Sequence, residues 1–371
     1  MSKVSIVNTK LDEQSIKKST KKAIELIGGM QRIIKKGNIV IIKPNFVGPI
    51  KSAVTNFDVI RSVVEEVKKC GGIPLLGEHS GFEFDTKKVF KILSVPELAK
   101  ELDVKLINFE NAECRKVRVF NGLFKELIIP KAVLEADVLI NIPKLKMHSL
   151  TTVTAGMKNL MGVLNKEERR KFHLKNLDLA IVDLNKVCKP NLTIVDATNV
   201  TKSAGYGKPV SVKAIVAGDD VVAVDKICCK IIGINYKKIR HINEAVKQGL
   251  CSKNIEIIGE FKETPVRLEK RILSQNVYCL FFKLMHAVDY VYSRIFPKRT
   301  LIPLFNWMVG LRPKIIKSKC TRCMKCVEVC PVWAIDNKLK INRKKCMDAR
   351  CLKCVEVCPV GAIQIKRGLK E

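Results

Sequence analysis

Cys-Thr-Arg-Cys-Met-Lys-Cys-Val-Glu-Val-Cys-Pro, residues 320–331, is the stretch that decides how the C-terminal end of this chain folds. Its cysteines are spaced C-x2-C-x2-C-x3-C and end in proline. Four more cysteines lie between residues 346 and 358, and they too end in Cys-Pro. Residues 351–363 repeat residues 323–335 almost letter for letter. The tail therefore contains two copies of one cysteine-bearing unit.

This spacing is the ligand run of bacterial-type [4Fe–4S] ferredoxins, and we expect two [4Fe–4S] clusters. Three closely spaced thiolates bind three corners of one cluster, while the remote cysteine before proline binds the other cluster. The ligands predicted for cluster I are Cys320, Cys323, Cys326 and Cys358, and those predicted for cluster II are Cys330, Cys346, Cys351 and Cys354. Because each cluster takes ligands from both copies, neither copy is expected to function alone.

The second copy is irregular at its first ligand. An offset of 28 residues places Asp348, not a cysteine, opposite Cys320, and the nearest cysteine is Cys346. We favour Cys346 as the fourth ligand, since thiolate is the softer donor. Asp348 as ligand, or a three-iron cluster with a labile iron, are the alternatives.

Other metal and redox chemistries fit the cysteines less well. Zinc sites pair two C-x2-C units across a spacer rather than triplets ending in Cys-Pro. No three cysteines have the C-x3-C-x2-C spacing of radical S-adenosylmethionine enzymes. The remaining seven cysteines have no ligand spacing and are expected to be small core residues.

The charge and hydropathy of the chain restrict its partners and location. The formal net charge is +32, or about +28 with two clusters of about −2 each. Lysines are spread along the chain, which favours the interpretation that they are scattered over solvated faces. An acidic redox protein or an anionic small molecule as partner is the next interpretation, and nucleic acid is an unlikely partner. No secretory leader is visible and thiols suit a reducing compartment, so we expect a cytoplasmic protein. The apolar stretch 277–296 is interrupted by charges and falls short of a membrane span.

Residues 1–260 alternate short apolar runs with longer amphipathic stretches. The runs expected to be strands are 4–7, 39–42, 73–76, 136–142, 192–195, 213–216 and 255–258, and the clearest helical stretches are 14–34, 57–69, 177–187 and 223–232. This alternation predicts an α/β domain with a mostly parallel, helix-covered sheet. Residues 261–313 read as a helical and apolar connector, for which contact with a membrane surface is a less favoured alternative. Residues 314–371 are predicted to form a small α+β two-cluster ferredoxin-like domain that needs its clusters to fold.

Three segments of the α/β domain follow strands and carry polar residues suited to a ligand. The candidates are Lys43, Asn45, Glu78, His79, Lys144, Lys146, His148 and Lys158. The lysines of segment 141–164, with a following helix N-terminus, favour a phosphate or carboxylate; a loop with solvated lysines is the alternative. Glu78 and His79 are an acid/base or metal candidate, although neighbours on a strand point apart. No catalytic residue can be assigned.

These segments resemble the DUF362 family with a C-terminal two-cluster ferredoxin domain. The resemblance rests on Lys43-Pro-Asn45, Gly77-Glu-x-Ser-Gly81, segment 141–164 and Ala217–Asp225. At one loop the chain has Gly205-Tyr-Gly-Lys-Pro209 where the family has a Gly-x-Gly-Pro-like segment. The resemblance implies the domain architecture, cluster binding and an anaerobic source, and it implies no reaction.

Three functions are consistent with the sequence. The favoured one is intracellular electron transfer through two clusters, with an N-terminal domain that binds an anionic ligand or redox partner. The first alternative is an oxidoreductase, a ferredoxin-coupled reductase acting on an anionic small molecule held by the N-terminal domain. The second is a redox sensor or scaffold.

Overall fold

The computed structural model describes residues 1–82, 84–202, 209–267, 275–296, 301, 311–343, 345–346 and 351–367. Asp348, residues 205–208 of the glycine loop and most of the apolar stretch 301–311 lie outside the described residues.

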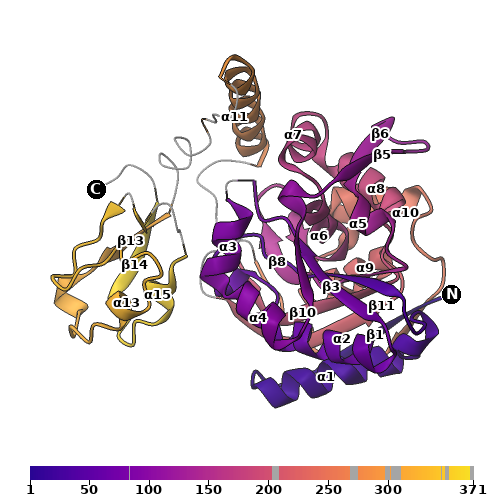
Figure 1. Cartoon of the computed structure of the whole chain (residues 1–371), viewed down its shortest axis with the longest axis horizontal. Coiled ribbons are helices and arrows are strands. Elements are labelled where there is room, and N and C mark those ends of the chain that lie inside the picture. The colour runs from indigo at the N-terminus through magenta and orange to yellow at the C-terminus, as the bar shows by residue number, and fades with distance from the viewer. Residues whose placement is uncertain are drawn as a thin grey trace.

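A ten-stranded mixed sheet forms the centre of the N-terminal region (Figure 1). In spatial order its main strands are β12 (Ile255–Ile258), β1 (Ser2–Asn8), β11 (Val210–Gly218), β10 (Leu192–Thr201), β7 (Val138–Asn141), β2 (Ile39–Lys43), β3 (Ile73–Glu78) and β4 (Lys105–Asn108). Strand β8 (Lys144–His148) pairs with β10 and with β9 (Thr152–Thr154). The run from β10 to β4 is parallel, whereas β11 is antiparallel to both its neighbours. The prediction of a mostly parallel sheet is confirmed.

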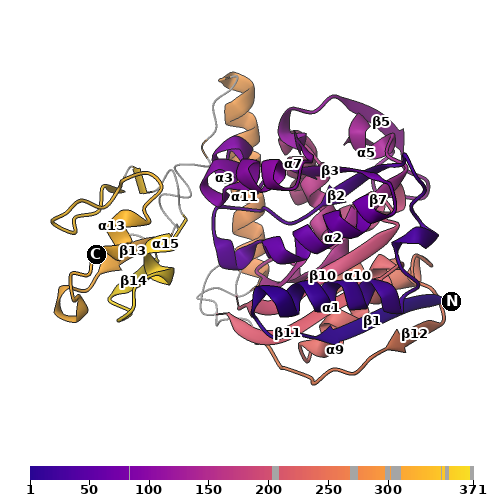
Figure 2. The ribbon, with the colours of Figure 1, turned by 60° about the horizontal axis from the view of Figure 1, so that its bottom comes forward.

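Helices cover both faces of this sheet (Figure 2). One face packs against α1 (Glu13–Leu26), α2 (Phe57–Lys69), α3 (Thr86–Leu93) and α4 (Val95–Glu101). The other packs against α6 (Gly156–Asn159), α7 (Lys166–Leu174), α8 (Leu177–Val187), α9 (Val221–Ile231) and α10 (Arg240–Lys247). In β2, Val40 and Ile42 belong to the first core and Ile41 to the second. This double burial explains why the strand is a continuous apolar run rather than an alternating one.

Smaller elements complete the N-terminal region. A hairpin of β5 (Cys114–Arg118) and β6 (Glu126–Pro130) leads into α5 (Lys131–Leu134). Short 3-10 turns are η1 (Met30–Arg32), η2 (Lys51–Ala53), η3 (Phe109–Asn111), η4 (Leu160–Val163) and η5 (Tyr236–Lys238). Turn η2 contacts the C-terminal domain.

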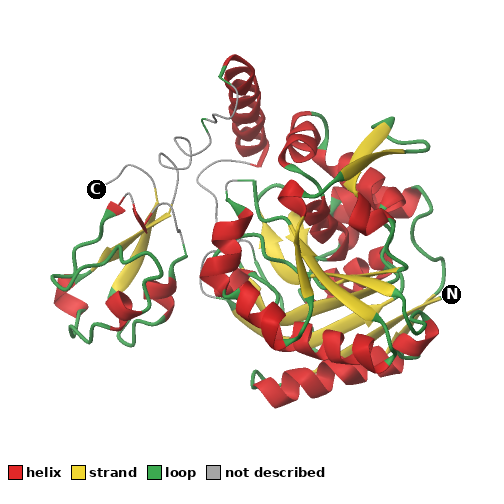
Figure 3. Ribbon diagram, in the orientation of Figure 1, coloured by secondary structure: helices red, strands yellow, loops and turns green. Residues whose placement is uncertain are grey.

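The long helix α11 (Gln275–Ile295) precedes the C-terminal domain, which is mostly loop with short helices and two strands (Figure 3). Strand β13 (Leu311–Ile315) pairs antiparallel with β14 (Ile363–Arg367), and the rest comprises η6 (Lys317–Lys319), α13 (Lys325–Glu328) and α15 (Lys353–Glu356). The small core includes three of the cysteines, Cys326, Cys330 and Cys354. Among the described residues, no helix is long and apolar enough to cross a membrane.

Candidate functional site

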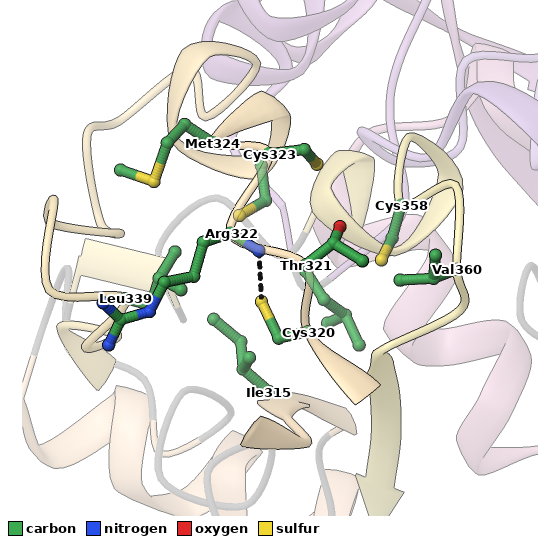
Figure 4. Close-up of a pocket in the computed structure, with 11 residues that line it drawn as sticks. Ile315, Cys320, Thr321, Arg322, Cys323, Met324, Leu339, Cys358 and Val360 are labelled. Atoms are coloured by element: carbon green, nitrogen blue, oxygen red, sulfur yellow. Dashed lines mark hydrogen bonds between the residues drawn. The ribbon is translucent and has the colours of Figure 1, made fainter. Parts of the chain in front are cut away.

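The four cysteines predicted for cluster I line one pocket at the edge of the C-terminal domain. Cys320, Cys323 and Cys326 come from the first copy, and Cys358 comes from the second (Figure 4). Strand pairing brings them together, because Ile315 and Ile363, which precede Cys320 and follow Cys358, are register partners in β13 and β14. Four thiols, one from the remote copy, are the donor set of a [4Fe–4S] cluster, so the residues present fit this group.

Backbone N–H groups already point at several of these sulfur atoms. Arg322 donates to Cys320 Sγ at 3.4 Å, and Ala362 donates to Cys358 Sγ at 3.2 Å. In the first copy Ala334 donates to Cys330 Sγ at 3.1 Å, in the same place relative to its Cys-Pro. Hydrogen bonds to ligand sulfurs stabilise their negative charge and tune the reduction potential of an iron–sulfur cluster.

The cysteines predicted for cluster II gather at the small core of the C-terminal domain, where Cys330 and Cys354 are buried and Cys346 packs against this core. Burial is the main cause that raises the pKa of Cys354 to about 12, and the neighbouring Cys346, Cys351, Cys330 and Cys326 contribute to this rise. Burial likewise raises the pKa of Cys346 to about 11, with Cys351 and Cys330 as the charged neighbours. Four thiols, three from the second copy and Cys330 from the first, are the donor set of a [4Fe–4S] cluster, so this set also fits such a cluster.

No group of three or more His, Cys, Asp or Glu side chains surrounds a single metal ion in the part of the chain that the structure describes. In a [4Fe–4S] cluster the ligands are spread over four corners, because each thiolate binds a different iron atom.

The second copy of the cysteine unit contacts the N-terminal region. Leu352 is buried against Ile50 and Ala53 at turn η2. Next to it, Lys353 Nζ donates to the carbonyl oxygen of Ile92, a residue of helix α3, at 2.8 Å. Ser52 Oγ donates to Glu356 Oε1 at 3.3 Å. The short helix α15, which carries Cys354, is thereby attached to the N-terminal region by one apolar and two polar contacts.

Beyond turn η2 lies a group of buried lysines. Lys43 Nζ donates to Glu78 Oε2 at 2.8 Å, and Lys144 Nζ donates to both Asp196 oxygens at 2.9 Å. Lys146 Nζ instead donates to neutral oxygens, Asn45 Oδ1 at 2.9 Å and the Ala53 carbonyl at 3.0 Å. All three lysines are 3 % exposed or less. The Ala53 carbonyl therefore links the buried lysines to the turn that α15 contacts.

Burial lowers the pKa of two of these lysines, Lys43 and Lys146. It lowers the pKa of Lys43 to about 8, although Glu78 opposes the shift. It lowers the pKa of Lys146 to about 7, and the positive charges of Lys158, Lys43 and Lys144 add to the effect. Among the described residues Lys146 forms no ion pair. A bound anion would therefore be the first negative charge to pair with the ammonium group of Lys146.

The alternative of a loop with solvated lysines is wrong for Lys144 and Lys146, which are buried. Residues 144–148 form strand β8, and the period of two places Lys144, Lys146 and His148 on one face of it. Strand β8 runs parallel to β10, which brings Lys144 opposite Asp196. The alternation Lys-x-Lys-x-His was the signal for a strand, and the expectation of a loop overlooked it.

The helix N-terminus expected to help bind an anion is already occupied. Helix α6 has four residues, and its first two N–H groups, from Gly156 and Met157, donate to the carboxylate of Asp225 at 2.6 and 3.0 Å. Burial raises the pKa of Asp225 to about 7, although these hydrogen bonds oppose the shift. The carboxylate of Asp225 thus takes the place foreseen for a ligand.

Glu78 and His79 do not act as a pair. The Glu78 carboxylate accepts from Lys43, from Phe46 N–H and from His79 N–H. The His79 ring points elsewhere, and its Nδ1 lies 2.6 Å from the Leu164 carbonyl. Burial and the charge of Arg169 lower the pKa of His79 to about 3, so its ring is neutral.

His148 and Lys158 are the half-buried members of the predicted set. His148 Nδ1 accepts N–H groups of Leu150 and Thr151, and its Nε2 lies 3.1 Å from Lys158 Nζ. They stand where the buried lysine group approaches the surface of the domain.

Several site residues were not predicted from the sequence. Asn159 Nδ2 donates to Asn141 Oδ1 at 2.8 Å, and its Oδ1 accepts from Asn45. Arg169 donates to the carbonyls of Met161, Ser80 and His79. Neutral amides and backbone-bound arginines carry no distinctive spacing, so only the motif Gly-Met-Lys-Asn around Asn159 could have indicated them.

Comparison with known proteins gives a family and few functional details. Residues 40–230 match the family described as "Domain of unknown function (DUF362)", and residues 312–359 match a "4Fe-4S dicluster domain". The chain is 27 % identical over 247 residues to "Thylakoid-associated protein sll1697" of Synechocystis sp., covering 64 % of this chain and 76 % of that protein.

Among solved structures, the lactate racemase apoprotein from Thermoanaerobacterium thermosaccharolyticum is 18 % identical with a TM-score of 0.42. The match covers 62 % of this chain and only 57 % of the racemase, and a likeness this low supports no argument about activity. The two family matches are sufficient by themselves: the chain belongs to the DUF362 family and carries a 4Fe-4S dicluster domain near its C-terminal end.

Proposed function

We propose that this protein transfers electrons between an acidic redox partner and its own N-terminal domain. Two [4Fe–4S] clusters, when bound by the two four-cysteine sets, supply reversible one-electron storage. The chain itself supplies the thiolates, the N–H groups that donate to them and the contact between the two domains. In this proposal the boundaries are 1–260, 261–313 and 314–371, and electrons leave the cluster domain through its second copy.

The observation that carries the proposal is the attachment of α15 to turn η2. Leu352 of α15's N-terminal side packs on Ala53, and the carbonyl of Ala53 accepts from Lys146. A freely tethered electron carrier has no need for such a contact. A cluster domain that serves the N-terminal domain does need it, because electron transfer requires a short, fixed distance.

The buried lysine group supports an anionic ligand in the N-terminal domain. Four lysines, Lys43, Lys144, Lys146 and Lys158, meet two carboxylates, Glu78 and Asp196. An anion beside Lys146 would favour the ammonium form and reverse the effect of burial. This observation also favours the second candidate, a reductase that acts on an anionic small molecule held there.

Anaerobic purification with iron and sulfide analysis tests the electron-transfer proposal. We expect about eight irons per chain, and the dithionite-reduced protein should show two interacting spins by EPR. About four irons, or a zinc content in their place, would rule out two clusters.

The variant Lys146→Met tests the lysine group through stability. The folded-state pKa of Lys146 is about 7 against 10.5 for the ordinary lysine, so the unfolded chain binds more protons between these values and stability rises with pH there. Lys146→Met should flatten this rise between pH 7 and 9 in denaturant titrations, while Lys253→Met, an exposed control, should not. Equal pH dependence in all three proteins would contradict the assignment.

Native mass spectrometry of the wild type and Lys146→Met checks for a copurifying anion that only the wild type retains.

A further inference from the structure

Helix α11 is anchored to the N-terminal domain through Asp289 and the side of the helix that carries it. Asp289 is fully buried on that side. Its carboxylate accepts from Arg170 of α7 at 2.7 Å and from the N–H of Leu301 at 2.6 Å. Met285, one turn earlier, is also buried. These contacts fix which face of the helix looks away from the domain.

The outward face of α11 is apolar along most of its length. It carries Leu280, Leu284, Val288, Val291 and Ile295, which are between 43 % and 68 % exposed. Their spacing of four, four, three and four residues forms one stripe on a helix. The stripe spans sixteen residues, so its ends are about 22 Å apart at a rise of 1.5 Å per residue. Monomeric soluble proteins rarely expose so long a contiguous row of large apolar side chains.

Positive charge accompanies this stripe. The exposed charged residues of α11 are Lys283 and Arg294, whereas its one acidic residue, Asp289, is turned inward. In the sequence from 267 to 300 there are seven Lys or Arg against two Asp or Glu. A stripe of Leu, Val and Ile with flanking cations is the pattern of a helix that lies in the interface of an anionic membrane.

We propose that α11 binds the surface of an anionic lipid bilayer through Leu280, Leu284, Val288, Val291 and Ile295. In both Figure 1 and Figure 2 one end of α11 extends beyond the N-terminal domain, which leaves the helix accessible to a flat surface. A second copy of this chain is a poorer occupant, because it would bring another net charge of +32 against the first. The helix lies on the bilayer and does not cross it, in accord with its length and charges.

Liposome flotation of the full, cluster-loaded chain tests this proposal. We expect the wild type to float with vesicles of phosphatidylcholine and phosphatidylglycerol, to float far less with pure phosphatidylcholine, and to be released as salt is raised. A wild type that stays with the unbound fraction in the presence of anionic vesicles overturns the proposal, whatever its iron content. Iron analysis and EPR on the same sample report separately on the electron-transfer proposal.

Matched variants locate the binding face. Leu284→Glu and Ile295→Glu should each lower the bound fraction roughly tenfold or more. Each variant removes an aliphatic side chain that is buried in the bilayer when the helix is bound, and each adds a negative charge that anionic lipid repels. Phe120 is an exposed apolar residue between β5 and β6, far in sequence from α11. The variant Phe120→Glu should therefore float like the wild type. Circular dichroism and iron content should be unchanged in all three, because these side chains are exposed. Equal flotation of all variants, or a dimer in light scattering that Leu284→Glu abolishes, would assign the stripe to something other than lipid and overturn the proposal.

Discussion

The two copies of the cysteine unit share the helix sequence Lys-Cys-Val-Glu but differ in their surroundings. In the first copy, helix α13 leaves Lys325 and Glu328 exposed. In the second copy, helix α15 uses Lys353 and Glu356 to contact Ile92 and Ser52 of the N-terminal domain. The lysine and the glutamate of this helix are therefore exposed in the first copy, and in the second copy they contact the N-terminal domain.

The residue before each helix distinguishes the copies. Both adopt the left-handed backbone conformation, with φ of 59° at Met324 and 52° at Leu352. Met324 is half-buried within its own domain, whereas Leu352 is buried against Ile50 and Ala53. A repeat thus preserves what the cluster ligands need, and contacts outside the repeat give each copy its own role. The comparison places the second copy against the N-terminal domain, and in our proposal the first copy meets the external partner.

The largest effect should come from replacing matched cysteine ligands, Cys326→Ser in the first copy and Cys354→Ser in the second. Each should lose about four of eight irons, because a hydroxyl is a poor ligand for iron–sulfur clusters. Only Cys354→Ser should also expose residues 49–54, since α15 then loses the cluster that orders it. Hydrogen exchange followed by mass spectrometry measures this, and equal exposure in both variants would remove the distinction between the copies.

The irregular first ligand of the second copy gives a related test. Cys346→Ser should remove cluster II, whereas Asp348→Asn should leave the iron content near eight. Iron analysis with EPR decides the matter. A cluster II that survives Cys346→Ser unchanged would refute the ligand assignment.

A smaller effect is expected at the residues that precede the two helices. Leu352→Ala should make local opening of the contact easier by about 2 kcal/mol, the cost of uncovering a buried leucine. Met324→Ala, at the matched position, should leave the exchange of residues 49–54 as in the wild type. If Leu352→Ala also leaves it unchanged, the apolar contact does not hold α15 in place.

The smallest effects should come from the two lysines of the repeat. Lys353→Met should weaken the contact by about 1 kcal/mol, because it removes one charge-assisted hydrogen bond to Ile92. Lys325→Met should leave the contact intact but slow reduction by an acidic flavodoxin a few-fold and reduce the salt dependence of that rate. Stopped-flow kinetics at increasing ionic strength provide the measurement. A rate that is flat with salt in the wild type would count against an acidic partner.

Much of the fold could be predicted from local patterns. The bounds of α2 and α8 coincide with the predicted stretches 57–69 and 177–187, because hydrophobic periodicity and capping residues act within a few turns. Strand β8 could not be recognised so easily, since its alternating residues are lysine and histidine rather than apolar ones. The carboxylate that pairs with the buried Lys144 belongs to Asp196, which lies 52 residues away in sequence.

The sequence by itself determined the ligand chemistry of this protein, because thiolate spacing within a short loop limits which metal centre can form. It also determined the α/β character of the N-terminal domain through the alternation of apolar runs. Only the tertiary structure decided which copy of the repeat faces inward, that Asp225 occupies the α6 N-terminus and that Lys146 donates to the carbonyl of Ala53. The physical reason is range: spacing and periodicity operate along the chain, whereas burial and charge compensation depend on residues that meet only when the chain is folded.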